Sequence, residues 1–170
     1  MLRSRTQVAV VAALAVTVAC LVAPSAEAKK IAYPDPSKAA FVIDVPDSWT
    51  ITPGKEVGDY VTLEGDSGVV VQMRTIEATQ DSVKEAMQDT IDFIKETYKD
   101  VQLGDMQDAK INGLDGFSAS GTGKDKDGDK MVFGIEWFLL KNNQLGEIWF
   151  AAAADDKDGL NEAASIERSF

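Results

Sequence analysis

Apolar and polar residues alternate with period two in the segments that follow residue 40. In the first of them Phe41, Ile43 and Val45 fall on one side, and Pro46 ends the run because it lacks an amide donor. A Gly-Asp-Ser-Gly turn at residues 65–68 separates the next two segments. Three short strands are therefore expected, at residues 41–46, 59–64 and 68–77. Trp49, just after the first strand, is expected to fill the core at a strand end.

Two stretches have the 3.6-residue period of an amphipathic helix. The first has an apolar stripe of Val83, Met87, Ile91, Ile94 and Tyr98. Ser82 and Glu85 have the spacing of a capping box, so this helix is expected to begin at Ser82. The second helix ends the sequence, with a stripe of Leu160, Ala163, Ile166 and Phe170.

Strand-like sequence lies between the two helices. Residues 101–123 are broken by Asn112-Gly113 and by Asp115-Gly116, two dipeptides typical of turns. Residues 131–140 and 144–154 follow as two long strands, joined by a short turn at residues 141–144. The order is therefore β-rich, helix, β-rich, helix.

The two long strands decide the expected architecture. If Lys141 pairs with Gln144 across Asn142-Asn143, Trp137 lies opposite Ile148 and both faces of the strand pair are largely apolar. Such a pair belongs in the middle of a sheet that is covered on both sides. The predicted fold is α+β: an α/β/α sandwich with a central twisted antiparallel sheet flanked by helices on both faces.

The first 28 residues have the organisation of a secretory signal peptide. Arg3 and Arg5 precede an uncharged apolar run at residues 8–22, and Ala26-Glu27-Ala28 forms a small-residue cleavage site. An uncleaved anchor is one alternative, although the run is shorter than a membrane span. Lipidation at Cys20 is another.

Cleavage after Ala28 predicts export to the periplasm or the extracellular space. The mature chain would have an extended N-terminal lead at residues 29–40, a single domain at residues 41–170, and no transmembrane segment.

Charge and composition exclude several classes of partner and chemistry. The chain carries 28 acidic and 17 basic residues and no histidine. Removing residues 1–28 takes away Cys20, the one cysteine, and leaves 27 acidic and 15 basic residues, a net charge of −12. Such an acidic protein repels nucleic acid and anionic membranes. Imidazole catalysis, thiol chemistry and the usual zinc sites are excluded as well.

Residues 124–130 read KDKDGDK and raise the question of a calcium site. Asp125, Asp127 and Asp129 alternate as in an EF-hand loop, with Glu136 at its twelfth position. However, Lys130 stands where that loop needs glycine, and Glu136 lies about 20 Å further along a strand. The segment is predicted to be a hairpin tip, and weak calcium binding is the alternative.

Glu136 and Glu147 form a second candidate site. In the register above they are diagonal neighbours on one face, about 7–8 Å apart, close to the separation of paired carboxylates in inverting glycosidases. The alternative is that the two acids lie at the edge of a partly solvated face, or that they pair with Arg74 or with a lysine. A three-residue turn between the strands would reverse the parity and separate the two acids.

Five segments together resemble the PsbP-like and DcrB-like family of secreted domains. They are FVIDVPDSWTI, SVKEAMQDTIDFI, INGLDGFSASGTG, the long aromatic hairpin and the closing IERSF. The resemblance covers residues 41–170 and implies an α/β/α sandwich. It also implies an accessory or binding module without a shared catalytic motif.

The expected function is therefore an exported, non-enzymatic accessory or binding domain of the cell envelope, with a protein partner and without a cofactor. A module that binds a small ligand or calcium through the aspartate loop is one alternative. A carboxylate-based hydrolase is another.

Overall fold

The computed structural model describes residues 28–56, 58–141 and 143–169. The helices are α1 (Gln80–Thr97) and α2 (Lys157–Glu167). The strands are β1 (Ala28–Tyr33), β2 (Phe41–Pro46), β3 (Thr50–Thr52), β4 (Val61–Glu64), β5 (Val70–Glu77), β6 (Lys99–Leu103), β7 (Gln107–Ile111), β8 (Leu114–Lys124), β9 (Lys130–Leu140) and β10 (Gln144–Ala153). The signal peptide expected at residues 1–28, including Cys20, lies outside the described residues except for Ala28.

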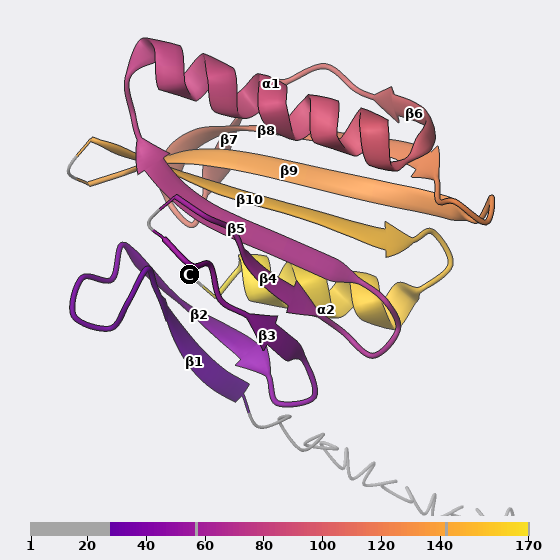
Figure 1. Ribbon diagram of the computed structural model, residues 1–170, viewed down its shortest axis with the longest axis horizontal. Helices are drawn as coiled ribbons and strands as arrows, with labels where there is room; N and C mark the ends of the chain where they lie inside the picture. The colour runs from indigo at the N-terminus through magenta and orange to yellow at the C-terminus, as the bar shows by residue number, and fades with distance from the viewer. Residues whose placement is uncertain (1–27, 57, 142, 170) are drawn as a thin grey trace, which may run out of the picture.

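An antiparallel sheet of eight strands forms the centre of the molecule (Figure 1). Its order is β3-β4-β5-β10-β9-β8-β6, and β7 also pairs with β8. The two long late strands, β9 and β10, lie in the middle, as their apolar faces predict. Helix α1 covers one face, while α2 and the β1-β2 ribbon cover the other (Figure 1). The predicted sandwich is confirmed.

Each face of the sheet has its own apolar cluster. On the α1 face, Ile94 packs with Phe133, Ile135, Trp137, Leu145, Trp149 and Ala151. On the α2 face, Ala163 and Ile166 pack with residues that include Ile43, Val45, Phe138 and Ile148. The apolar residues of the central strands therefore point to both sides, which is why both sides need a cover.

The predicted register between β9 and β10 is wrong by one residue. Leu140 pairs with Gln144, so Glu147 lies opposite Trp137 and Glu136 lies opposite Ile148. Three residues, not two, separate the paired positions, and Asn143, the last of them, has a left-handed φ of 57°. A left-handed residue at that position is typical of three-residue hairpin loops.

Helix α1 begins earlier than the capping-box spacing predicts. Thr79 is its N-cap, and its side chain accepts a hydrogen bond from the Ser82 amide. The Ser82 side chain in turn accepts one from the Thr79 amide, so the capping box is Thr79–Ser82 and not Ser82–Glu85. Of the predicted stripe, Val83, Met87, Ile94 and Tyr98 pack in the α1-face cluster, and Ile94 is fully buried. In α2, Ala163 and Ile166 are buried, while Phe170 lies outside the described residues.

One of the two turns predicted between residues 101 and 123 is correct. Asn112 and Gly113, with φ of 48° and 85°, form the turn between β7 and β8. Asp115-Gly116 lies within β8 instead of breaking it. At Gly116 a Cβ atom would lie 2.1 Å from the Trp137 carbonyl oxygen, so glycine is needed there for close approach to β9.

The segment expected to be an extended lead is extended only up to Tyr33, where it forms a paired strand, and residues 34–40 turn back toward β2. Strand β1 pairs along its whole length with β2. Tyr33 stacks on Phe41 with ring centroids 5.2 Å apart, and both side chains are buried. As predicted, Phe41, Ile43 and Val45 face the core, and Trp49 is buried. The lead therefore contributes to the α2-face cluster, although its sequence has little apolar pattern.

Candidate functional site

The aspartate loop forms the tip of the β8-β9 hairpin, as predicted. Lys124 pairs with Lys130 across it. One carboxylate oxygen of Asp125 accepts hydrogen bonds from the amides of Asp127 and Asp129, both at 2.9 Å. The Asp125 carboxylate therefore stabilises the turn. In the part of the chain that the structure describes, no group of three or more acidic, histidine or cysteine side chains could hold a metal ion.

We expect millimolar calcium to leave the Tm of the purified protein unchanged. A ligand raises Tm only if it binds the folded state preferentially, and here the Asp125 carboxylate is already engaged by backbone amides. Differential scanning fluorimetry with and without calcium, using magnesium as the ion control, measures this. A calcium-dependent rise in Tm that Asp127→Asn abolishes would restore the calcium-binding alternative.

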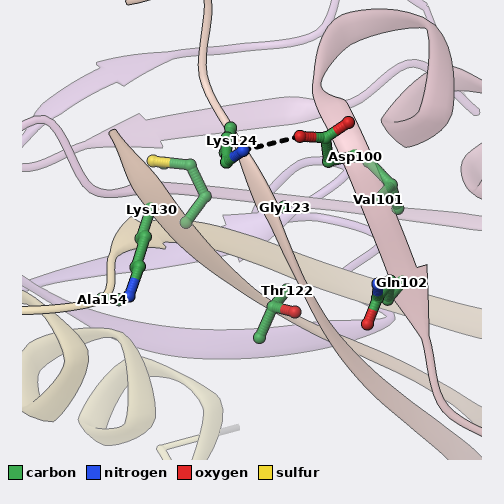
Figure 2. A pocket seen from close by; sticks show the side chains of 9 residues that line it. Asp100, Val101, Gln102, Thr122, Gly123, Lys124, Lys130 and Ala154 are labelled. Carbon is green, nitrogen blue, oxygen red and sulfur yellow. Dashed lines mark hydrogen bonds and ion pairs between the residues drawn. The ribbon is translucent and has the colours of Figure 1, made fainter. Parts of the chain in front are cut away.

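A cavity of about 620 Å³ lies beside this tip between the ends of β6, β8 and β9 (Figure 2). Lys124 Nζ lies 2.7 Å from Asp100 Oδ2 on its wall. The hydrogen bond from Lys124 holds the pKa of Asp100 below its usual value. Lys130, Thr122 and Gln102 complete the polar lining. The cavity has the size of a small-molecule site, but its acid is paired and fully ionised at neutral pH.

The two acids proposed as a carboxylate pair lie on opposite faces of the sheet. Neighbouring positions along a strand point to opposite sides, and the observed register puts Glu147 on the α1 face with Trp137 and Trp149. Glu136 lies on the α2 face, where it lines a cavity. The three-residue turn is the physical reason, because it reverses the parity of β10 relative to β9. The glycosidase-like pair is therefore contradicted.

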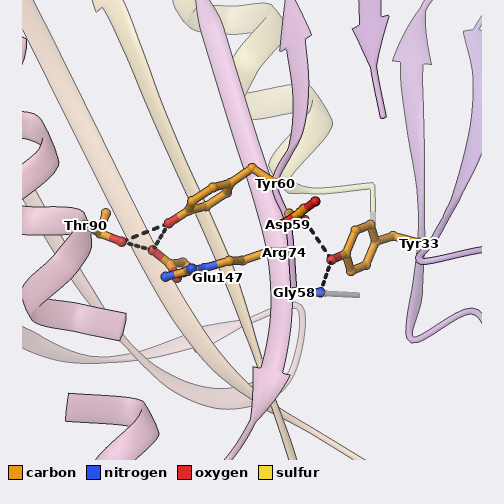
Figure 3. A network of polar contacts seen from close by, with 7 residues as sticks. All are labelled: Tyr33, Gly58, Asp59, Tyr60, Arg74, Thr90 and Glu147. Carbon is orange, nitrogen blue, oxygen red and sulfur yellow. Dashed lines mark hydrogen bonds and ion pairs between the residues drawn. The ribbon is translucent and has the colours of Figure 1, made fainter. Parts of the chain in front are cut away.

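Glu147 lies at the centre of a buried polar network (Figure 3). Arg74 Nε donates to Glu147 Oε2 at 2.8 Å, and the Tyr60 hydroxyl donates to Oε1 at 3.0 Å. The Thr90 hydroxyl also donates to Oε1. The Arg74 guanidinium lies 4.4 Å from the centre of the Tyr60 ring. The alternative prediction that Glu147 pairs with Arg74 is thus correct.

This network joins four separate parts of the chain, one of which is Tyr60, the residue directly before β4. Glu147 is in β10, Arg74 lies directly opposite it in β5, and Thr90 comes from the buried side of α1. Burial, and next the Glu147 charge, raise the pKa of Tyr60, so its hydroxyl stays protonated and remains a donor. With Glu147 fully buried and paired, the arrangement is suited to holding α1 on the sheet and not to proton transfer with a substrate.

Glu136 meets a partner that sequence reasoning missed. Glu167, at the C-terminal end of α2, lines the same cavity of about 340 Å³. Burial raises the pKa of Glu136. Burial, and next the charge of Glu136, raise the pKa of Glu167 to about 8. The available signal was that Glu167 directly follows Ile166, an apolar residue of the predicted α2 stripe.

Several large apolar side chains on the α1 side of the sheet are exposed. Leu139 of β9 is 51% exposed, and Phe117 of β8, which lies opposite Trp137 on the same face, is 37% exposed. Phe93 of α1 is 46% exposed and has its ring centroid 5.6 Å from that of Trp149. Phe93, Phe117 and Leu139 are called the α1-side apolar residues below.

Comparison with known proteins shows the fold. No protein-family model and no curated protein sequence matches the chain. Cyanobacterial PsbP from Synechocystis superposes with a TM-score of 0.56 at 12% identity, covering 88% of this chain and 95% of its own. LpqN of Mycobacterium tuberculosis, described as involved in cell envelope biogenesis, has a TM-score of 0.51 at 17% identity, covering 83% of this chain and 87% of its own.

A protein from Bacteroides thetaiotaomicron gives a TM-score of 0.55 at 12% identity, and the match covers 84% of this chain. It covers 47% of that protein, so the chain spans about half the length of this neighbour. The fold is therefore PsbP-like, as the resemblance implies. The DcrB-like part of the resemblance stays a prediction.

Proposed function

We propose that this protein is an exported, non-catalytic accessory domain of the cell envelope that binds a protein partner through its α1 side. The observation that supports this proposal best is the exposure of Phe93, Phe117 and Leu139 on that side. Large aromatic and aliphatic side chains left in water are typical of protein interaction sites. The net charge of −12 expected for the chain without residues 1–28 favours a partner whose apolar centre has a basic rim.

The environment of the two candidate acids favours binding over catalysis. A glycosidase needs two carboxyl groups in one substrate-binding cleft, flanking the scissile bond. Here Glu136 and Glu147 lie on opposite faces, and Glu147 is enclosed with Arg74. PsbP and LpqN share the fold, and the envelope role described for LpqN agrees with the proposal.

Export rests on the signal peptide at residues 1–28 and its predicted cleavage after Ala28. Cleavage there would leave Lys29–Tyr33 of β1 paired with β2, so the fold tolerates removal of the leader. Within the residues that the structure describes, no helix is long and apolar enough to cross a membrane. Lipidation of Cys20 instead of cleavage after Ala28 remains the alternative, and intact-mass measurement of the mature protein distinguishes the two.

We expect a photo-crosslinking amino acid at Phe117 or Leu139 to capture the same protein in envelopes of the producing cell. The same amino acid at Val42 is a matched control, because Val42 is also apolar and 42% exposed but lies in the β1-β2 ribbon on the other side. A basic partner also predicts that capture weakens as salt rises. Mass spectrometry identifies the captured protein.

A double variant, Phe117→Ser with Leu139→Ser, tests the same side chains without a crosslinker. Because both are already exposed, its Tm should stay close to that of the wild type, while capture from a third position on the α1 side, Phe93, is lost. Identical crosslink patterns from Val42 and Leu139, or capture that the double variant does not reduce, would contradict an α1-side interface.

A further inference from the structure

We propose that Glu136 and Glu167 form a proton-sensitive latch that fastens the C-terminal end of α2 to the sheet. The latch is closed while the pair retains a proton, and it opens when both carboxyl groups are ionised. This inference concerns the α2 side and is independent of the partner proposed for the α1 side.

The β7-β8 turn and β2 hold the C-terminal end of α2 through side-chain hydrogen bonds. Asn112 Nδ2, in the β7-β8 turn, donates to the Glu167 carbonyl oxygen at 3.0 Å. The Asp44 amide of β2 donates to Ser169 Oγ at 2.9 Å. Ile166, fully buried, anchors the last turn in the α2-face cluster. Glu167 lines the cavity at this end of α2. The charge of its carboxyl group therefore affects how stably the helix end is docked.

Within the described residues, one carboxylate oxygen of Glu167, Oε1, is buried and has no hydrogen-bond partner. Burying a charged oxygen without a hydrogen-bond partner costs free energy. A protonated carboxyl group is neutral, so its burial costs less, and it can donate a hydrogen bond. A closed latch therefore requires that one proton stays on the pair.

The groups around Glu167 supply little compensating charge. β9 contributes Glu136, and the loop before β7 contributes Asp105 to the same cavity. Strand β8 contributes the neutral Ser118 and Ser120, β7 contributes Gln107, and β10 contributes Phe150. On β2, Asp44 lies near the helix end and pairs with Lys30. Arg168 is the adjacent cation on α2, and its charge lowers the pKa of Glu167 less than burial and Glu136 raise it.

The direction of the pH effect follows from these shifts. The pKa of Glu167 is about 8 in the folded protein, against an ordinary value of 4.5 in an unfolded chain. Below pH 4.5 the group is protonated in both states, so it contributes no pH dependence there. Between pH 4.5 and about 8 the unfolded or undocked state gives up its proton more readily. The closed latch therefore weakens progressively as pH rises through this range.

The test is carried out on the folded mature chain with two readouts. Carbon-13 NMR of the glutamate carboxyl groups should show a signal from the pair with a midpoint near pH 8. In Glu136→Gln the Glu167 midpoint should move down toward ordinary values. Hydrogen exchange of the α2 amides, corrected for intrinsic rates, should show roughly a hundredfold more opening at pH 9 than at pH 6. Between the pKa of 4.5 in the open state and about 8 in the closed state, each rise of one pH unit increases the open population about tenfold, and about two such units lie between pH 6 and pH 8.

Glu167→Gln should abolish the excess opening at pH 9, since glutamine stays neutral. Asp158→Asn is the matched control, because Asp158 is an exposed acid on the same helix outside the cavity, and it should behave like the wild type. If all glutamate signals titrate near 4.5, or if α2 exchange is independent of pH, there is no latch. The wild-type titration decides the question even if a variant fails to fold.

Discussion

Replacing Arg74 with methionine should lower the free energy of unfolding by about 3–5 kcal/mol, measured by urea denaturation at neutral pH. The guanidinium is the one cation that contacts Glu147 among the described residues, and the Glu147 side chain is 0% exposed. Without it the carboxylate is left buried with two hydroxyl donors and no opposite charge. Because Thr90 links the network to α1, this helix should be the first element to lose its contacts with the sheet.

Two controls separate this effect from a general cost of losing charge. Lys110→Ala breaks an ion pair with Asp115 whose side chains are 70% and 78% exposed, so it should cost less than about 1 kcal/mol. Arg74→Met combined with Glu147→Gln should recover much of the loss, because the amide oxygen still accepts from Tyr60 and Thr90. A single-variant loss below about 1 kcal/mol would show that the buried pair does not hold the fold.

Gly116→Ala should be the most disruptive single methyl addition in the sheet, at about 3 kcal/mol or more. The new Cβ would lie 2.1 Å from the Trp137 carbonyl oxygen and 3.0 Å from the Phe138 Cα. Both are backbone atoms of β9, so no side-chain rotation relieves the clash, and β8 must move away from β9. Urea denaturation measures the loss of stability, and the near-ultraviolet circular dichroism of the protein should change because Trp137 is beside the clash.

Gly104→Ala is the matched control for this substitution. Its Cβ would lie 3.4 Å from the nearest atom, the Ser120 carbonyl oxygen, and its φ is not left-handed. Its effect on stability should stay within about 0.5 kcal/mol of zero. Equal effects of the two alanines would show that the β8-β9 approach is less tight than the structure indicates.

The sequence predicted the fold class because its strongest signals are periodic. The alternation in β2 and the stripe of α1 each mark one buried side. The apolar character of β9 and β10 on both sides required a central, covered position, and the sheet order agrees. These features follow from local pattern and the need to bury apolar surface.

The candidate site was not predictable from the same patterns. Whether Glu136 and Glu147 share a face depends on one residue of loop length, and an Asn-Asn dipeptide fits a two-residue or a three-residue turn. A difference of one residue in the loop moves every side chain of β10 to the other face of the sheet. Glu147 is therefore not on a partly solvated face but in the interior beside Arg74.

The meeting of Glu136 with Glu167 is hidden for a different reason. The two acids are brought together by the docking of α2 across the sheet, and no spacing within either segment encodes that contact. Likewise, serine is a residue type that is common at helix N-caps, so Ser82 was a reasonable candidate. Thr79 is the N-cap instead, because β5 ends at Glu77 and α1 begins at Gln80. In both cases the tertiary arrangement, and not the local sequence pattern, decided the outcome.

Strand β10 joins two parts of the sheet whose strands lie far apart in the sequence. It pairs with β5 on one side and with β9 on the other, so β3, β4 and β5 connect to the rest of the sheet through residues 144–151. Contacts this distant in sequence form slowly during folding. A nascent polypeptide that has not yet released β10 therefore keeps an unpaired β5 edge, and the sheet can close only after residue 153 has left the ribosome.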